Sequence, residues 1–183
     1  MLLNFIIISL CFNMPTIYSS VKTIKKLYYN NLLTYDIYKN DIITNNTLLT
    51  AEHIFPKSLT KYYMYAKYDM HNIFLTSAET NIYRSNYKFV NETINQKIHY
   101  SNIYKFYIPC HFARGQIART LAYMKFIYPK LEIDLVIDRD LLINWNKKYS
   151  VNELENKRNY LIKKEQGNSN LFIDDPDKLE LLF

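Results

Sequence analysis

The stretch Leu49-Thr-Ala-Glu-His-Ile-Phe-Pro-Lys-Ser58 places an acid and a histidine side by side near the end of an apolar run. Because this run is rich in β-branched and apolar residues, we expect residues 47–55 to form a strand. Neighbouring side chains on a strand point to opposite faces, so Glu52 and His53 can serve one site only where the strand ends or becomes irregular. Pro56 predicts such an end. This stretch therefore sets the local fold and offers a candidate site.

The segments around this strand predict a small sheet followed by a helix. Residues 33–38 are expected to be extended, and the Asn- and Asp-rich residues 39–46 favour a turn. Together with residues 47–55 they predict a β-hairpin. Residues 76–85 predict a helix, so the expected local order is strand, strand, helix.

The second half of the chain predicts mostly helix, over residues 114–127, 139–148 and 150–165. Thr76 or Ser77 is the expected N-cap of the helix over residues 76–85. Ser150 is the expected N-cap of the last helix, which should end near Gly167. Three large residues on these helices are expected in the core: Tyr123, Met124 and Trp145. The pattern favours an α+β fold without repeats or a second domain.

Composition and charge limit the kinds of site and partner that the chain can have. The chain has 183 residues, of which 49% are hydrophobic, and a formal net charge of +6. Its 2 glycines leave no room for a glycine-rich phosphate loop, so phosphate chemistry would need side chains, helix ends or a metal. The basic surface favours a polyanionic partner, either nucleic acid or an anionic membrane. Cys11 and Cys110 form no CxxC motif, so neither a zinc site nor a disulfide is expected.

The first segment is strongly apolar from Leu2 to Phe12. It is too short to span a bilayer comfortably, so we expect no stable membrane insertion. Its length is typical of the apolar part of a signal peptide. We therefore expect a signal peptide over residues 1–20 and one domain over residues 21–183, in a secreted or lumenal protein. No basic residue precedes the run, and an N-terminal helix docked on the core is the alternative.

Polar residues downstream complete a constellation with Glu52 and His53. Asp69-Met-His-Asn72 comes first, and Asn81-Ile-Tyr-Arg84 follows on the expected helix. A histidine suits deprotonation of water near pH 7, carboxylate and amide oxygens suit magnesium, and an arginine can grip phosphate. These residue types fit phosphodiester hydrolysis. The competing interpretation is that a Glu-His pair and a helical asparagine are ordinary surface residues, which is the commoner case for short motifs.

Several stretches together resemble the endonuclease I family, secreted or periplasmic nucleases of the His-Me finger (ββα-metal) group. They occur in the family's order and run from about residue 35 to the C-terminus. The matching stretches are Leu49-Thr-Ala-Glu-His-Ile-Phe-Pro-Lys-Ser58, Asp69-Met-His-Asn-Ile73, Asn81-Ile-Tyr-Arg-Ser-Asn-Tyr-Lys-Phe89, Arg114-Gly-Gln-Ile-Ala-Arg119 with Tyr123-Met124, Leu142-Ile-Asn-Trp145 and Gln166-Gly-Asn-Ser-Asn-Leu-Phe-Ile-Asp174. Each stretch is modest alone, and their combination is specific.

The resemblance implies a role for each matching residue. His53 matches the general base, and Glu52 and Asn81 match the ligands of one Mg²⁺ ion, which Mn²⁺ or Ca²⁺ could replace for binding. Asn72 matches a position that shapes the site. The remaining implied roles concern the nucleic acid, with Arg84 and Arg119 as catalytic arginines near the phosphate and Lys57 and Arg114 as nucleic-acid-binding residues.

The chain departs from the family pattern in two ways. Some members carry several disulfides, which this chain cannot form. Others carry a longer insert that contributes an arginine, whereas no arginine lies between His53 and Asn81 here. Lys57, Lys61 or Lys67 could supply positive charge instead, but without the bidentate geometry of a guanidinium.

The implied fold is a ββα-metal finger embedded in a mostly helical single domain. The implied activity is hydrolysis of DNA, with RNA as a second substrate, to 5′-phosphate ends by a monomer. Contacts to the backbone rather than the bases would make cleavage largely independent of sequence. The alternatives are a secreted relative with weak or no catalysis that binds nucleic acid, or one that interacts with a host. Of the other histidines, His71 is expected to be structural, and His99 and His111 are expected on the surface.

Overall fold

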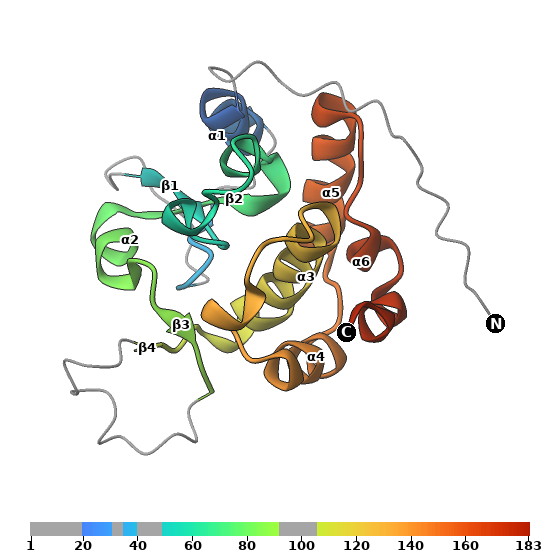
Figure 1. Ribbon diagram of the computed structural model, residues 1–183. Coiled ribbons are helices and arrows are strands. Elements are labelled where there is room, and N and C mark those ends of the chain that lie inside the picture. Colours follow the sequence, from blue (N-terminus) through green and yellow to red (C-terminus); the bar gives the residue numbers. More distant parts are fainter. Residues whose placement is uncertain (1–19, 31–34, 40–48, 92–105) are drawn as a thin grey trace.

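The computed structural model describes residues 20–30, 35–39, 49–91 and 106–183. Within these ranges the fold is α+β and mostly helical, with two two-stranded sheets. The longest helix, α3 (His111–Ile127), passes through the middle of the molecule, with the larger sheet on one side and the later helices on the other (Figure 1). Residues 1–19 of the expected leader, including Cys11, lie outside the described residues, as does His99.

The larger sheet does not form the hairpin that the sequence predicts. Strand β1 (Leu49–His53) pairs antiparallel with β2 (Ile73–Ser77), and His53 lies opposite Ile73. The described part of the expected partner, residues 35–39, forms a turn that donates one backbone hydrogen bond to β2, from Ile37 N–H to the Leu75 carbonyl at 3.1 Å. The prediction was wrong because β2 is a continuous apolar run, and strand periodicity cannot identify such a run.

Strand β2 is apolar on both faces because it lies between two hydrophobic clusters. Phe74 belongs to the cluster around α3, whereas Ile73 and Leu75 belong to a second cluster with α1 (Ser20–Asn30) and Ile162. All four residues from 73 to 76 are buried. This double cover holds β2, and with it β1, in a fixed position.

Helix α2 (Ala78–Arg84) follows β2 directly, so the local order is strand, strand, helix, with β2 in place of the strand expected over residues 33–38. The expected cap is confirmed, since the Ser77 hydroxyl accepts a hydrogen bond from Thr80 N–H at 3.2 Å. The helix ends at Ser85, whose φ of 51° is the only positive value at a non-glycine residue in the described chain. Such a conformation costs on the order of 1–3 kcal/mol and tends to mark functional sites.

The connection between β1 and β2 is a long loop built from three short 3₁₀ helices: η1 (Lys57–Leu59), η2 (Ala66–Tyr68) and η3 (Met70–Asn72). Asn72 closes this loop. Its side-chain oxygen accepts from Phe55 N–H at 2.7 Å, and its amide nitrogen donates to the Phe55 carbonyl at 3.0 Å. The two ends of the loop are therefore held together next to His53.

The remaining elements are β3 (Lys88–Phe89), β4 (Phe106–Tyr107), η5 (Ile133–Leu135), α4 (Arg139–Lys148), α5 (Glu153–Gln166), α6 (Leu171–Asp174) and η6 (Pro176–Leu182). Strands β3 and β4 are parallel. The expected bounds of α4 are confirmed. The cap of α5 is Asn152 rather than Ser150, since its side chain accepts from Glu155 N–H at 2.9 Å. Gly167 ends α5 with φ 95°, as predicted.

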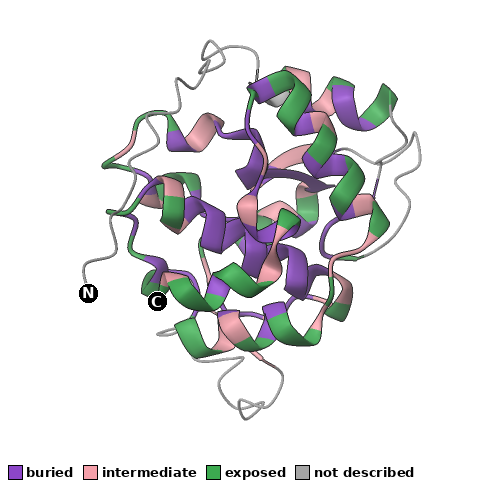
Figure 2. Ribbon diagram, turned by 90° about the vertical axis from the view of Figure 1, so that its right-hand side faces the viewer, coloured by how far each residue is buried: buried purple, intermediate pink, exposed green. Residues whose placement is uncertain are grey.

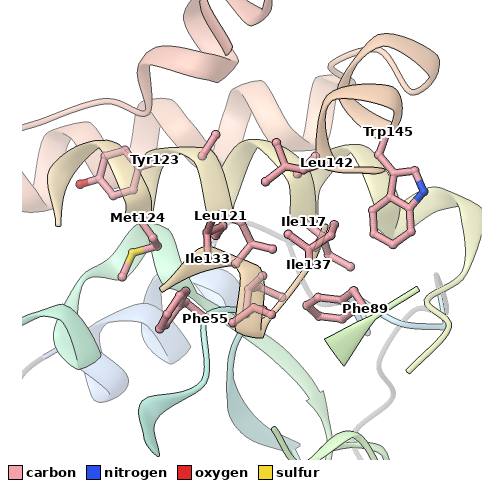
Figure 3. Packing of buried hydrophobic residues seen from close by; sticks show 14 of the residues in the cluster. Phe55, Phe89, Ile117, Leu121, Tyr123, Met124, Ile133, Ile137, Leu142 and Trp145 are labelled. Atoms are coloured by element: carbon pink, nitrogen blue, oxygen red, sulfur yellow. The ribbon is translucent and has the colours of Figure 1, made fainter. Parts of the chain in front are cut away.

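The main core surrounds α3, whose residues 113–124 are all buried (Figure 2). Figure 3 shows Phe55 and Phe89 facing Ile117 and Leu121 of this helix. The three large residues expected in the core are buried there: Tyr123, Met124 and Trp145. No helix in the described ranges is long and apolar enough to cross a membrane.

Candidate active site

An open pocket with a cavity volume of about 390 Å³ lies where β1, α2 and the loop after β1 meet. Its lining residues are Glu52, His53, Pro56, Lys57, Ser58, Asn81, Arg84, Ser85 and Asn86. The structure therefore brings together the expected base, both expected metal ligands, one expected arginine and one expected lysine. Asn72 lies behind the pocket wall, where it fixes the backbone of Phe55.

His53 is held in one orientation by a backbone carbonyl. Its Nε2 lies 2.8 Å from the carbonyl oxygen of Lys67. A carbonyl can only accept, so in the neutral ring Nε2 carries the proton and Nδ1 keeps its lone pair. Burial lowers the pKa of His53, and the charges of Lys57 and Arg84 lower it further, although the bond to Lys67 opposes them. The ring is thus poised as a neutral proton acceptor.

Glu52 points to the interior side of β1 and is only 2% exposed. Two side chains contact the same carboxylate oxygen, Oε1: the Tyr38 hydroxyl donates to it at 2.7 Å, and Arg84 Nε lies 3.4 Å away. Burial raises the pKa of Glu52, and the Arg84 charge and the Tyr38 hydrogen bond partly offset this. A buried carboxylate with incomplete charge compensation favours a nearby cation.

Asn81 presents an amide oxygen to the same pocket. Its amide nitrogen donates to the Thr50 hydroxyl at 2.8 Å and to the Ala51 carbonyl at 3.2 Å. Both contacts use the nitrogen, so they fix the amide with Oδ1 as the available acceptor.

The donor set is typical of magnesium rather than of zinc. Among the described residues no three His, Cys, Asp or Glu side chains cluster as a metal site. Magnesium is commonly held by one or two protein oxygens, with water and phosphate as its other ligands. Glu52 and Asn81 fit that pattern.

Arg84 acts on the pocket from behind. Its Nη2 donates to the Ile54 carbonyl at 2.7 Å and its Nη1 to the Ser85 carbonyl at 2.8 Å. Its guanidinium also lies over the Phe89 ring, 4.6 Å from the centroid, and the residue is 1% exposed. These contacts occupy the guanidinium nitrogens that were expected to bind phosphate. We therefore assign Arg84 the role of positioning Glu52 and the backbone at the end of β1.

Arg119 and Arg114 are not among the residues that line this pocket. Arg119 forms a buried bidentate ion pair with Glu155, in which both N–O distances are 2.7 Å. Arg114 is 2% exposed, donates to the Pro109 carbonyl at 3.2 Å, and stacks over Trp145. The structure thus places both arginines in buried contacts and does not bring them to the pocket, where Arg119 was expected as a catalytic residue and Arg114 as a nucleic-acid contact. Both arginines hold α3 to its neighbours.

Sequence reasoning missed several features of the site. Tyr38 lies outside every matching stretch, yet it donates to Glu52. The Lys67 carbonyl orients His53 through a backbone atom, which a sequence pattern cannot reveal. Nothing in the sequence indicated the positive φ of Ser85, because the residue is not glycine.

The sequence that carries this pocket matches a known family over most of its length. Residues 13–177 match the sequence model of the family described as Endonuclease I. The chain belongs to the endonuclease I family. The resemblance inferred from the six stretches is therefore confirmed, and the match covers every described element except the last residues of η6.

Two relatives place this endonuclease I chain among characterised proteins. It is 37% identical over 114 residues to a protein named extracellular deoxyribonuclease from Aeromonas hydrophila, an alignment that covers 58% of this chain and 49% of the relative. It is 34% identical over 116 residues to a protein named endonuclease-1 from Buchnera aphidicola subsp. Baizongia pistaciae, covering 57% of this chain and 45% of the relative. The matched region thus spans about half the length of each relative.

Proposed function

We propose that the chain is a magnesium-dependent endonuclease that hydrolyses DNA, and secondarily RNA, with little sequence preference. The observation that carries the proposal is the His53 ring, held by the Lys67 carbonyl in the same pocket as Glu52 and Asn81. On this proposal β1, β2 and α2 form a ββα-metal finger. Mn²⁺ or Ca²⁺ would occupy the same oxygens without necessarily supporting turnover.

Glu52 and Asn81 are the residues that would hold the ion, because both offer hard oxygen donors in the pocket. When bound there, a divalent cation supplies positive charge to the scissile phosphate and to the departing 3′ oxygen. The Arg84 charge favours the ionised form of Glu52, against the burial that raises the pKa of that carboxyl, and helps to hold the side chain in place. The two hydrogen bonds that the Asn81 amide nitrogen donates orient the amide so that its oxygen is available to the ion.

His53 carries the proton transfer. Its Nδ1 takes a proton from a water molecule, and the water oxygen attacks the phosphorus while the P–O3′ bond breaks. The 3′ oxygen takes a proton from solvent, which leaves one strand end with a 5′-phosphate and the other with a 3′-hydroxyl. The Lys67 carbonyl stabilises the charged ring that results, because Nε2–H becomes a stronger donor once the imidazole is cationic.

Lys57 is exposed at the pocket edge and supplies a point charge for the phosphate backbone. Together with the net charge of +6, this supports binding that depends on phosphates rather than bases. Affinity for duplex DNA should therefore fall steeply with salt, with a log–log slope of about 0.9 per phosphate contact. An affinity that is insensitive to salt, or that depends on one sequence, would contradict this part of the proposal.

The central test is plasmid digestion in Mg²⁺, with and without EDTA, by the wild-type protein and by His53→Ala. Nicking and linearisation should require Mg²⁺ and should be absent in the variant. The alternative is a relative that binds nucleic acid or a host partner without catalysis. Full cleavage in EDTA would overturn the metal requirement, and plasmid that stays intact in Mg²⁺ at high protein concentration would favour the alternative.

We also propose that residues 1–20 are a signal peptide, that residues 21–183 are the mature monomer, and that the protein is secreted or lumenal. The apolar run from Leu2 to Phe12 supports this, as does the name of the Aeromonas hydrophila relative, an extracellular deoxyribonuclease. N-terminal sequencing of protein from a secretion-competent cell should find a start near Val21. A start at Met1 on intracellular protein would reject the leader.

A further inference from the structure

The loop between β1 and β2 carries an unusual mixture of aromatic and cationic side chains. No acidic residue occurs from 53 to 68, whereas this stretch contains three lysines and four tyrosines. Three of its large residues are exposed: Tyr62 by 56%, Met64 by 63% and Tyr65 by 44%. The proposed mechanism uses none of these three, so the loop has a surface whose purpose is unexplained.

The exposure is built into the loop rather than caused by a loose segment. Tyr63 turns inward, packs against Tyr128 at 5.2 Å between ring centroids, and accepts a hydrogen bond from Lys130 N–H at 3.1 Å. Ala66 is fully buried. Thr60, which is buried and accepts a backbone hydrogen bond from Tyr63 N–H at 2.9 Å, anchors the chain before Tyr62, and Tyr63 and Ala66 flank Tyr65, so both rings are held on the outer side of the loop. Large apolar groups fixed in water indicate a surface that meets a partner.

Both ends of this loop belong to the candidate active site. Lys57 lines the pocket at one end, and the Lys67 carbonyl holds His53 at the other. A strand whose phosphate lies against His53 therefore meets a loop that begins and ends at the pocket. The partner of the exposed rings is expected to be the same molecule that enters the pocket.

The chemistry of the loop favours a nucleic acid strand with unpaired bases. Lysines attract phosphates, and aromatic rings bind bases by stacking in proteins that hold single strands. Lys61 lies over the Tyr62 ring at 4.8 Å from its centroid, which places a cation and an aromatic face together. In an intact duplex the bases already stack on one another and offer these rings no free face.

We propose that Tyr62 and Tyr65 stack on unpaired bases of the strand bound in the pocket, so that the preferred substrate contains single-stranded segments. This inference rests on the proposed function and deepens it by naming the substrate class. It predicts that affinity depends on the presence of bases but not on their identity, because every base has a stacking face.

The test measures binding separately from cleavage. In a His53→Ala background, fluorescence anisotropy gives the affinity for a single-stranded oligonucleotide, for an abasic oligonucleotide of equal length and charge, and for a duplex. Replacing both rings by Tyr62→Ser and Tyr65→Ser should weaken binding to the base-bearing strand by about tenfold per ring. Binding to the abasic strand should change little, because its phosphates still meet the lysines.

Tyr160 on α5 provides a matched control. It is 57% exposed, and Lys164 lies over its ring at 4.5 Å, so it repeats the surroundings of Tyr62 away from the pocket. Tyr160→Ser should leave all three affinities unchanged. Tyr62→Phe with Tyr65→Phe should keep the preference for the base-bearing strand, because phenyl rings also stack. Thermal unfolding should be the same in every variant, since the altered side chains are exposed.

Equal wild-type affinity for the abasic and base-bearing strands would overturn the inference, as would unchanged binding by the double serine variant. The second result would assign the exposed rings to a partner other than nucleic acid. Failure of the proposed function is seen separately, as a wild-type protein that does not cleave plasmid in Mg²⁺. A base-dependent affinity in such a protein would leave the stacking assignment standing.

Discussion

The pocket and the core each contain a histidine bound to a backbone carbonyl and an arginine paired with a glutamate, but the two regions differ in how tightly these groups are paired and how accessible they are. His53 in the pocket and His71 in the core both place Nε2 on a backbone carbonyl, at 2.8 and 2.9 Å. Arg84 pairs with Glu52 at a loose 3.4 Å, whereas the core arginine Arg119 pairs with its glutamate at 2.7 Å through two bonds. The groups are of the same chemical types, and they differ in which atoms solvent or substrate can reach.

The two histidines differ in access rather than in residue type or hydrogen-bond partner. His71 is fully buried and packs on the Tyr123 ring, so its Nδ1 reaches no solvent or substrate. His53 has the same tautomer, but its ring lines an open pocket. The prediction that His71 is structural is therefore confirmed by its burial and its hydrogen bond.

The largest expected effect separates the two histidines. Loss of a general base typically lowers the rate about a hundredfold to ten-thousandfold, so His53→Ala should abolish plasmid cleavage and keep DNA binding. His71→Gln should keep the activity of each folded molecule and lower the free energy of unfolding by about 1–3 kcal/mol, because it disturbs a buried hydrogen bond. Cleavage rates and urea titrations on both variants check this. More than about a tenth of wild-type activity in His53→Ala would remove its role as base.

The two arginines should differ in stability. Arg119→Ala leaves the Glu155 carboxylate buried without a partner and should lower the free energy of unfolding by about 3–5 kcal/mol. Arg84→Ala should cost less, and Mg²⁺ should restore part of the loss, because a cation beside Glu52 can replace the guanidinium charge. Thermal unfolding with and without Mg²⁺ measures both. Equal rescue of both variants by Mg²⁺ would contradict the placement of the ion at Glu52.

The proposed ligands should show a graded dependence on the metal. Glu52→Gln should raise the Mg²⁺ concentration needed for half-maximal activity by more than the roughly 10–100-fold typical of outer-sphere partners, because it removes the only charged ligand. Asn81→Ala should raise it less, since a neutral amide contributes less than a carboxylate, and excess Mg²⁺ should rescue it in part. Asn156 on α5, which is exposed, offers a matched Asn→Ala control. Unchanged Mg²⁺ titrations in both pocket variants would argue against these ligands.

The smallest effects concern pH. The pKa of His53 is lowered by burial and by Lys57, so the acidic limb of the activity profile should lie below the ordinary histidine value of about 6.5. Lys57→Glu replaces a positive neighbour with a negative one and should move that limb upward by less than about one pH unit. The control is Lys147→Glu on α4, away from the pocket. If the acidic limb of the activity profile does not move in Lys57→Glu, the profile does not report the protonation of His53.

His71 makes the corresponding prediction for stability. Burial lowers its pKa to about 4, well below that of an unfolded chain. Below about pH 6.5 the unfolded chain gains a proton that the folded chain does not, so the stability is complete above that pH and declines as the pH falls toward 4. This group alone contributes at most about 1.4 kcal/mol per pH unit to the decline. Urea titrations of His71→Gln should show a shallower decline than the wild type between these values.

The sequence predicted the parts of the fold that rest on local signals. The N-cap at Ser77, the bounds of α4 and the stop at Gly167 all depend on residues within one helical turn, and all are confirmed. The partner of β1 and the cap of α5 were wrong because the first depends on burial on both faces of β2, and the second on which of two nearby polar residues reaches the first turn. Short patterns do not contain that information.

For the site, the resemblance named five residues that the structure brings to one pocket, namely Glu52, His53, Asn81, Arg84 and Lys57, but it also named two arginines that lie elsewhere. Arg119 has the same residue type as a phosphate-binding arginine, and only its distant partner Glu155 reveals the structural role. The Lys67 carbonyl and the Tyr38 hydroxyl reach the site from separate segments. Their contributions depend on how the chain folds back on itself.

The loop beside His53 is anchored by residues that are made late in synthesis. Met70 N–H donates to the Gln166 side chain across 96 residues, and His71 reaches the Asn168 carbonyl across 97. Translation must therefore pass Asn168 before these two contacts, which follow the segment that carries the Lys67 carbonyl, can form. A nascent chain exposes His53 well before all the contacts around its loop are complete.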